Sequence, residues 1–136
     1  MNRKILHLDL DAFFCSVEEL LDLSLVGKAF AVGGSPQGRG VIASCSYAAR
    51  LKGVHSAMPA GKAIQLCPEL LLIHHRHNLY SEYSDRVMSI LQDTTPLVEQ
   101  VSVDEAFLDV SDLPQPLKLI AVGLQKRVAD ETQLPC

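Results

Sequence analysis

The chain has 136 residues, of which 48% are hydrophobic, and carries a formal net charge of −4 at pH 7. This length suits about one domain with a small appendage, and the apolar content argues against a disordered chain. No apolar run approaches the roughly 18 residues that span a bilayer. The N-terminus turns acidic at Asp9 and Asp11, too early for a signal peptide, so we expect a cytoplasmic protein with no membrane partner.

Cysteine spacing and charge limit the function further. The four cysteines form no C-x-x-C pair, which argues against zinc and redox motifs and favours small apolar side chains: Cys15, Cys45, Cys67 and Cys136. A negative charge is unusual for a DNA-binding protein, because phosphate contacts need surplus Lys and Arg. Either DNA is not the partner, or the basic surface lies on chain that is absent here.

Hydrophobic patterning predicts helices between strands, an α/β order. Strands are expected at 4–10, 29–32, 41–45 and 70–74, and as a tightly joined pair within 98–110. The glycines at 33, 34, 38 and 40 predict a hairpin between the second and third strands. Helices are expected at 13–21, with Glu18 and Glu19 on the polar side, and at 47–52, 60–66, 79–93 and 117–129. Pro59 suits the first turn of the third helix, and Tyr83 joins Val87, Ile90 and Leu91 on one face of the fourth.

Asp9 is the first candidate for chemistry. It lies at the end of an apolar strand, where an isolated carboxylate is costly unless something positive meets it. Asp9 could equally be a helix N-cap or a salt-bridge partner instead of a metal ligand. For Asp11 alone, a helix N-cap or a salt bridge is the simpler interpretation.

Asp104 and Glu105 form a second acidic feature inside the final strand pair, although strands are depleted in Asp. Neighbours in a regular strand point to opposite faces, so both carboxylates can face one point only where the chain turns or bulges. A solvated hairpin tip is the ordinary alternative. Together with Asp9 they offer three hard oxygen donors of the kind that Mg²⁺ accepts beside phosphates and water.

Three segments resemble the motifs of Y-family DNA polymerases, the DinB-like polymerase IV group. Residues 9–18 (DLDAFFCSVE) resemble the N-terminal signature, 44–54 (SCSYAARLKGV) the nucleotide-binding fingers motif, and 102–110 (SVDEAFLDV) the catalytic hairpin. The resemblance covers essentially the whole chain. The three motifs occur in the family's order, and jointly they are specific.

The resemblance implies a role for each matching residue. Asp9, Asp104 and Glu105, with the Leu10 carbonyl, would hold two Mg²⁺ ions, with Mn²⁺ as an alternative. The backbone N–H groups of Phe13 and Phe14 would face the nucleotide phosphates, and the Phe14 ring would be a steric gate against ribose. The other implied phosphate ligands are Ser44, Tyr47 and Arg50.

Several of these residues also have plainer interpretations. Phe14 could be ordinary core packing, and Tyr47 and Arg50, three residues apart, could share one face of a surface helix. Ser44 and Ser46 depart from the Thr and Asn expected in the family, although Ser44 keeps the hydroxyl. Cys15 and Cys45 are expected to pack near the nucleotide without reacting. The His74-His75-Arg76-His77 run is interpreted as a surface loop rather than a metal site.

The resemblance implies an α+β fold. A ferredoxin-like palm, with a mixed or antiparallel sheet and helices on one face, would occupy 1–12 and 76–136, and a small α/β fingers insertion would occupy 13–75. The chain would be truncated before the thumb and little finger, which carry most of the DNA grip. We therefore expect this piece to bind duplex DNA poorly and to be weakly active or inactive alone.

The implied function is error-prone translesion DNA synthesis in DNA damage tolerance, with primer-template DNA and dNTPs as partners. A sliding clamp would bind through the missing C-terminal chain. One alternative is a catalytically silent relative that acts by binding proteins. Another is a palm-type nucleotidyl cyclase, in which Phe14, Tyr47 and Arg50 would have no role.

Overall fold

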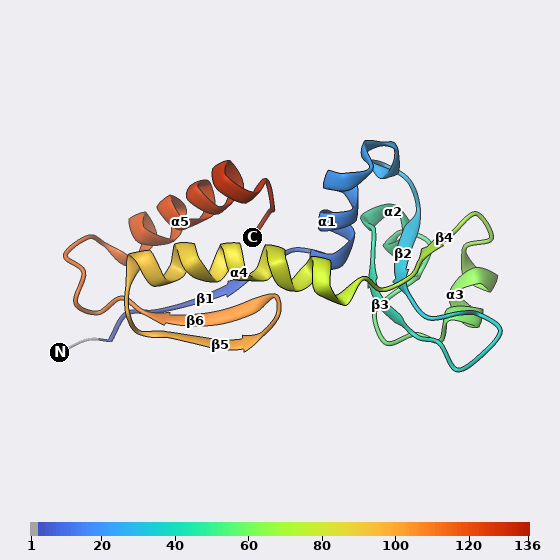
Figure 1. Ribbon diagram of the computed structural model, residues 1–136, viewed down its shortest axis with the longest axis horizontal. Helices are drawn as coiled ribbons and strands as arrows, with labels where there is room; N and C mark the ends of the chain where they lie inside the picture. The colour runs from blue at the N-terminus through green and yellow to red at the C-terminus, as the bar shows by residue number, and fades with distance from the viewer. Residues whose placement is uncertain (1–2) are drawn as a thin grey trace. The chain divides into compact units, whose positions relative to one another are not determined.

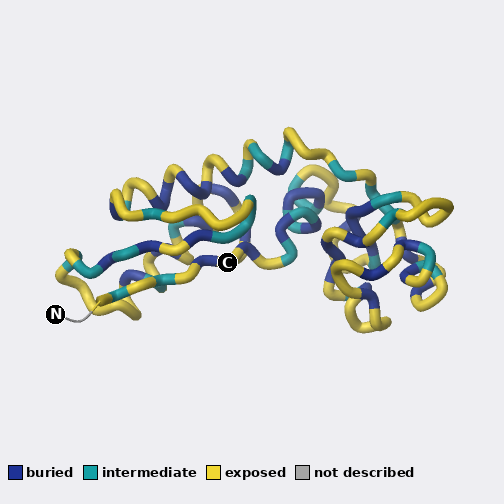
Figure 2. The backbone as a smooth tube through the Cα atoms, turned by 90° about the horizontal axis from the view of Figure 1, so that it is seen from below, coloured by how far each residue is buried: buried dark blue, intermediate teal, exposed yellow. Residues whose placement is uncertain are grey.

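The computed structural model describes residues 3–136, which fold as two compact units (Figure 1). The first unit combines Met1–Asp11 with Asn78–Cys136, and the second is Ala12–His77. The expected palm segment 1–12 includes residues 1–2, which lie outside the described residues. Buried residues occur along the chain of both units (Figure 2), so each has a core of its own.

The first unit is built on an antiparallel sheet with the strand order β1-β6-β5. Its strands are β1 (Ile5–Asp9), β5 (Val98–Ser102) and β6 (Glu105–Asp109). Leu8, Ala106 and Leu108 are buried, whereas His7 and Phe107 on the alternate face are exposed. One face therefore packs on the core and the other faces solvent, as the period of two in a strand requires.

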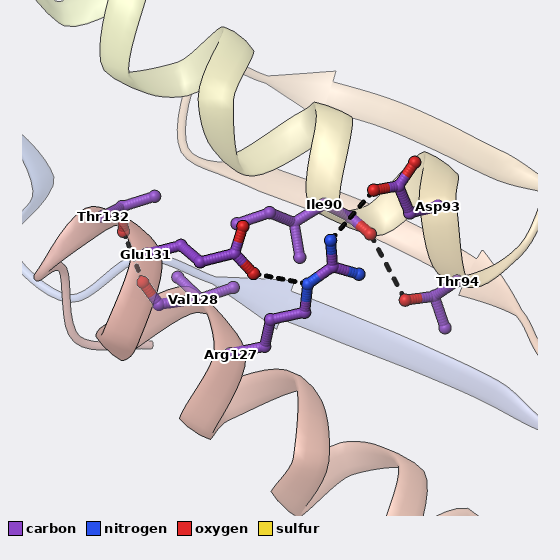
Figure 3. A network of polar contacts seen from close by, with 7 residues as sticks. All are labelled: Ile90, Asp93, Thr94, Arg127, Val128, Glu131 and Thr132. Carbon is purple, nitrogen blue, oxygen red and sulfur yellow. Dashed lines mark hydrogen bonds and ion pairs between the residues drawn. The ribbon is translucent and has the colours of Figure 1, made fainter.

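Two helices cover the apolar face of this sheet: α4 (His77–Thr94) and α5 (Leu117–Thr132), which lie along one side of it in Figure 1. Figure 3 shows a polar link between them, in which the Arg127 guanidinium bonds Asp93 Oδ2 on α4 at 2.9 Å and Glu131 Oε2 on its own helix at 2.5 Å. Near the end of α5, the buried Thr132 hydroxyl donates to the Val128 carbonyl at 2.6 Å. The Arg127–Asp93 ion pair thus links α5 to α4 at exposed side chains.

The second unit holds a mixed sheet in the order β3-β2-β4. Its β2–β3 hairpin is antiparallel, and β2 pairs with β4 in parallel. The hairpin loop needs glycine, because a Cβ at Gly34 would lie 2.7 Å from the Gly40 Cα. In chain order the elements are α1 (Phe13–Leu21), η1 (Leu23–Leu25), β2 (Phe30–Gly33), β3 (Ile42–Cys45), α2 (Tyr47–Arg50), α3 (Ala60–Leu66) and β4 (Leu71–Ile73).

The structure confirms the α+β fold, with helices on one face of an antiparallel sheet and a second small sheet with its own helices. Helices 13–21 and 60–66 have the predicted bounds, and the other predicted elements differ at their ends by one to three residues. The short helix η1 was not predicted. In the described part of the chain, no helix combines the length and apolar character needed to cross a bilayer.

Three predictions of detail were wrong. Glu18 is 1% exposed and buried on α1, because Arg76 neutralises it. Tyr83 is only half-buried and lies under the Arg86 guanidinium, and Tyr80 takes the buried position on α4. Pro59 is the N-cap of α3, one position before its first helical residue, and its carbonyl accepts from the Ala63 N–H at 3.1 Å.

Candidate functional site

Strand pairing brings together carboxylates that are nearly a hundred residues apart in sequence. In the register of β1 with β6, Asp9 lies directly opposite Glu105. Just beyond β1, the Leu10 N–H donates to the Asp104 carbonyl at 2.9 Å. The end of β1 is therefore attached to the turn that carries the acidic pair, and all three predicted carboxylates lie at one end of one sheet.

The turn before Glu105 is held by its own side chains. The Ser102 hydroxyl donates to Asp104 Oδ1 at 2.8 Å, and the Gln100 amide donates to the Ser102 carbonyl at 3.0 Å. From α4, the Ser84 hydroxyl donates to the Val103 carbonyl. The β5–β6 register also shifts between Gln100 and Ser102. The predicted tight turn is present, and a register irregularity precedes it; Asp104 lies in the turn, and Glu105 is the first residue of β6.

The carboxylates repel one another. The pKa of Asp9 is raised above its ordinary value, first by burial, then by the negative charges of Asp104 and Glu105, and slightly by Asp11. The nearby His7 opposes this shift. Such a concentration of negative charge is costly in the isolated chain, and a cation would relieve it.

His7 is a component that the sequence interpretation missed. Its Nε2 lies 2.7 Å from Glu105 Oε1, and its ring stacks on Phe107 with the ring centroids 4.5 Å apart and 19° between the planes. The signal was present, because His7 and Asp9 are two residues apart on a strand and must share a face. The open face of the sheet thus carries an imidazole beside the acidic group.

The donor set fits a hard cation, although the side chains do not surround one. Within residues 3–136, no group of three or more His, Cys, Asp or Glu side chains is arranged to hold a metal ion. Glu105 Oε1 instead lies against His7 Nε2, and Asp104 accepts a hydrogen bond from Ser102. Carboxylate oxygens remain the ligands that Mg²⁺ prefers.

The second unit carries the predicted nucleotide-binding residues. Helix α1 begins at Phe13, as the motif predicted, and its N-cap is Ala12 in the left-handed region with φ 41°. That conformation is uncommon for a residue with a Cβ, and it occurs mainly where the surrounding structure or the function requires it. The Phe14 ring meets the ring of Phe13 at 5.6 Å and that of His75 at 4.7 Å.

Tyr47 and Arg50 share a face of α2, as their spacing predicted. The Arg50 guanidinium lies 4.7 Å from the centre of the exposed Tyr47 ring, and its Nε donates to the Cys45 carbonyl at 3.3 Å. The Ser44 hydroxyl on β3 is buried, and no side chain or backbone group in the described residues completes a hydrogen bond of regular geometry with it. Hydroxyl and guanidinium donors therefore gather around the start of α2.

Ser46 was underrated by the sequence interpretation. Its hydroxyl donates to the Lys28 carbonyl at 2.9 Å, and it accepts from the Phe30 N–H at 3.0 Å and from the Ala49 N–H at 3.3 Å. It is therefore the N-cap of α2 and also ties that helix to β2. A serine before a short helix was the available signal.

Cys15 and Cys45 lie beside this group and are each 1% exposed. Burial raises the pKa of the Cys15 thiol to about 12, against a smaller opposing effect of the Ser44 hydroxyl. A thiol with so high a pKa is a poor nucleophile near neutral pH. Cys67 is also buried, so three of the four cysteines are apolar core residues as predicted, whereas Cys136 is half-buried.

Comparison with known proteins gives a consistent result. The model of the impB/mucB/samB family matches residues 8–136. The DNA polymerase IV of Alkalilimnicola ehrlichii is 45% identical over 97% of this chain and 38% of its own length. The DNA polymerase IV of Pseudomonas aeruginosa strain PAO1 is 47% identical over 97% of this chain and 39% of its own length. The chain thus spans about two fifths of the length of the curated relatives it matches.

Solved structures agree with this result. The crystal structure of DinB from Sulfolobus solfataricus superimposes with a TM-score of 0.89 and 29% identity, covering 96% of this chain and 40% of that one. An insertion ternary complex of Dbh DNA polymerase gives the same values. The family model and the solved structures both cover nearly the whole chain, and the chain belongs to the impB/mucB/samB family.

Proposed function

We propose that this chain is the catalytic portion of a translesion DNA polymerase that transfers deoxynucleotides from dNTPs to a primer. The observation that carries the proposal is the pairing of Asp9 with Glu105 on adjacent strands, with Asp104 on the attached turn. The two curated relatives compared above are named DNA polymerase IV, and they match nearly the whole chain.

The two units would divide the work. The first unit is proposed as the palm and the second, Ala12–His77, as the fingers; the boundaries of the two compact units support this division. In the palm, Asp9, Asp104 and Glu105 would hold Mg²⁺ together with the Leu10 carbonyl. When bound, such ions supply a lowered pKa at the primer hydroxyl and neutralise phosphate charge.

The fingers residues would bind and select the nucleotide. Arg50 offers planar donors suited to phosphate oxygens, and its stacking on Tyr47 orders that long side chain before a ligand arrives. The Ser44 hydroxyl would add a neutral donor. The Phe14 ring would stand against the sugar and exclude a ribose hydroxyl.

Nucleotide binding by the 136-residue chain tests the proposal directly. Calorimetric titration with dATP and Mg²⁺ should show binding that Arg50→Ala weakens about tenfold, because a charge-assisted contact to phosphate is lost. Lys52→Ala is the matched control, since Lys52 is a nearby cation already paired with Glu69 at 3.4 Å. Equal losses in both variants would indicate nonspecific charge, and no binding by the unmodified chain would refute the site.

The partners of the whole protein belong to the same proposal. Primer-template DNA and dNTPs follow from the named polymerase relatives, and a sliding clamp would bind outside this chain. Because its net charge is −4, the chain itself should bind DNA weakly. A salt-sensitive, submicromolar affinity of the 136 residues for primer-template DNA would contradict that expectation.

A catalytically silent, protein-binding relative is the second candidate. It is favoured by one observation, the engagement of Glu105 with His7 and of Asp104 with Ser102, which leaves the described side chains without a formed metal cluster. Mg²⁺ titration distinguishes the two. If the chain binds Mg²⁺ stoichiometrically and Asp104→Asn abolishes this binding, the result supports the polymerase. If the chain binds no Mg²⁺ even in the presence of dATP, the result supports the silent module.

A further inference from the structure

The Phe14 ring has an aromatic neighbour that the sequence motifs do not include. The ring of His75, in the segment that follows β4, meets it in an edge-to-face arrangement with centroids 4.7 Å apart and an interplanar angle of 82°. This is a preferred geometry for aromatic pairs, because the positive edge of one ring meets the negative face of the other. The contact lies wholly within the second unit.

A second contact fixes the same segment to the same helix. Glu18, one turn after Phe14 on α1, forms a two-pronged ion pair with Arg76, whose Nε lies 3.1 Å from Glu18 Oε2 and whose Nη2 contacts Oε1. Residues four apart on a helix share a face. The adjacent residues His75 and Arg76 therefore meet adjacent turns of α1, so the backbone at His75 has little freedom to move away.

The His75 side chain is itself constrained. It is half-buried, and its ring stacks on that of His77 with centroids 5.7 Å apart. Its pKa is lowered by burial and then by its neighbours His77 and His74, so the imidazole is neutral near pH 7. A neutral ring held from two sides acts on Phe14 as an aromatic wall.

The interpretation of 74–77 as a plain surface loop is therefore incomplete. His74 is exposed, and within the described residues these histidines belong to no metal-holding group. The rings of His75 and His77 nevertheless stack on each other, and that of His75 meets Phe14 edge to face.

We infer that His75 is a positioning residue that holds the Phe14 ring in the orientation needed to discriminate deoxyribose from ribose. The inference rests on the proposed function, in which Phe14 is the sugar gate. His75 touches no reacting atom and acts through Phe14 alone. If the Phe14 ring could rotate about its χ angles, it would open space for a 2′-hydroxyl. Loss of the His75 ring should therefore weaken the selection of deoxyribose over ribose without removing nucleotide binding.

The first test observes the ring directly in the 136-residue chain. Carbon-13 labelling of phenylalanine gives four residues to assign, and the Phe14 ring signals should shift and sharpen in His75→Ala because the neighbouring ring current and the restraint are lost. His75→Phe, which restores an aromatic ring, should recover restricted motion. His74→Ala is the matched control and should leave the Phe14 signals unchanged. Unchanged signals in His75→Ala, or no recovery in His75→Phe, would overturn the inference.

The second test measures the ratio of ATP to dATP binding with Mg²⁺. His75→Ala should raise relative ATP binding about 3- to 10-fold, the range expected from losing one aromatic pair, and Phe14→Ala should raise it further. An unchanged ratio in Phe14→Ala rejects the gate and thus that part of the proposed function. A raised ratio in Phe14→Ala with an unchanged ratio in His75→Ala overturns only the role of His75. Recovery of the low ratio by His75→Phe supports positioning over a general structural effect.

Discussion

His7 Nε2 and Glu105 Oε1 lie 2.7 Å apart on two adjacent antiparallel strands, and the His7 ring is held against Phe107. The imidazole therefore contacts one oxygen of the Glu105 carboxylate, which is a metal ligand in the proposed function. Side-chain exposures of 44% for His7 and 33% for Glu105 mean that solvent screens the pair. Such pairs contribute about 0–1 kcal/mol, so a cation can displace the imidazole at small cost.

Replacing His7 should consequently strengthen Mg²⁺ binding. His7→Leu frees Glu105 while keeping an apolar contact with Phe107, and we expect the Mg²⁺ dissociation constant to fall about two- to fivefold. His55→Leu is the control, because His55 is an exposed histidine in the other unit whose Nδ1 contacts the Ser56 carbonyl. Calorimetric titration measures both variants. Weaker binding in His7→Leu would mean that His7 supports the metal site instead of competing with it.

Asp9 should show a trade-off between stability and metal binding. Its raised pKa reflects partial loss of solvent around the carboxylate and repulsion from Asp104 and Glu105, so Asp9→Asn should stabilise the metal-free chain. Because Asp9 is exposed and screened, the gain should be at most about 0.5 kcal/mol. The same change should weaken Mg²⁺ binding at least tenfold, since one hard oxygen ligand is lost.

Urea denaturation with and without Mg²⁺ separates these two effects. Mg²⁺ should raise the unfolding midpoint of the unmodified chain and leave that of Asp9→Asn almost unchanged. Asp85→Asn, an exposed aspartate on α4, should behave as the unmodified chain does. Equal stabilisation of Asp9→Asn by Mg²⁺ would remove Asp9 from the ligand set.

Local sequence signals predicted the elements well where a pattern and its end signals agreed. Helix α1 has the predicted bounds because its apolar spacing ends at 21, and helix α3 because Pro59 and Pro68 flank its apolar spacing at 60–66. The acidic turn was predictable because Asp is rare in strands, and Asp104 indeed lies in the turn between β5 and β6. Its proximity to Asp9 could be anticipated only through the family motifs, because strand order depends on long-range pairing.

Sequence patterns did not indicate the tertiary partners of polar residues. The helical pattern predicts Glu18 on the polar side of α1, because nothing near it in sequence indicates Arg76, which lies 58 residues later. His7 and His75 were passed over for the same reason, since ring stacking with Phe107 and Phe14 exists only in the folded chain. A charged or aromatic side chain is placed by partners that periodicity does not specify.

The Glu18–Arg76 ion pair should be a major contributor to the stability of the second unit. Arg76→Ala takes the guanidinium from a carboxylate that is 2% exposed, and breaking such buried pairs typically costs about 3–5 kcal/mol. Arg76 is itself half exposed, which lets water reach the site, so we expect about 2–3 kcal/mol in urea denaturation. Pairing Arg76→Ala with Glu18→Gln should cost less than the sum of the single changes.

The control for this pair is Arg86→Ala. Arg86 and Glu82 form an exposed pair at 3.3 Å on α4, and its loss should change the free energy of unfolding by less than about 0.5 kcal/mol. If Arg76→Ala were as mild as Arg86→Ala, burial of Glu18 would not depend on the ion pair.

Thiol reactivity should distinguish Cys15 sharply from Cys136. The pKa of Cys15 is raised to about 12, chiefly by burial, so at pH 8 only about one molecule in ten thousand carries the reactive thiolate. Because a thiol gains its negative charge as pH rises, the alkylation rate of folded Cys15 should increase about tenfold per pH unit between pH 7 and 9. Burial also raises the pKa of Cys136, but this half-buried residue remains accessible and should react first.

Mass spectrometry after timed iodoacetamide treatment measures alkylation at each cysteine, with the urea-unfolded chain as the reference in which all four cysteines react. Modification of Cys15 as fast as Cys136 in the folded chain would show that α1 opens readily and leaves the Ser44 hydroxyl unshielded.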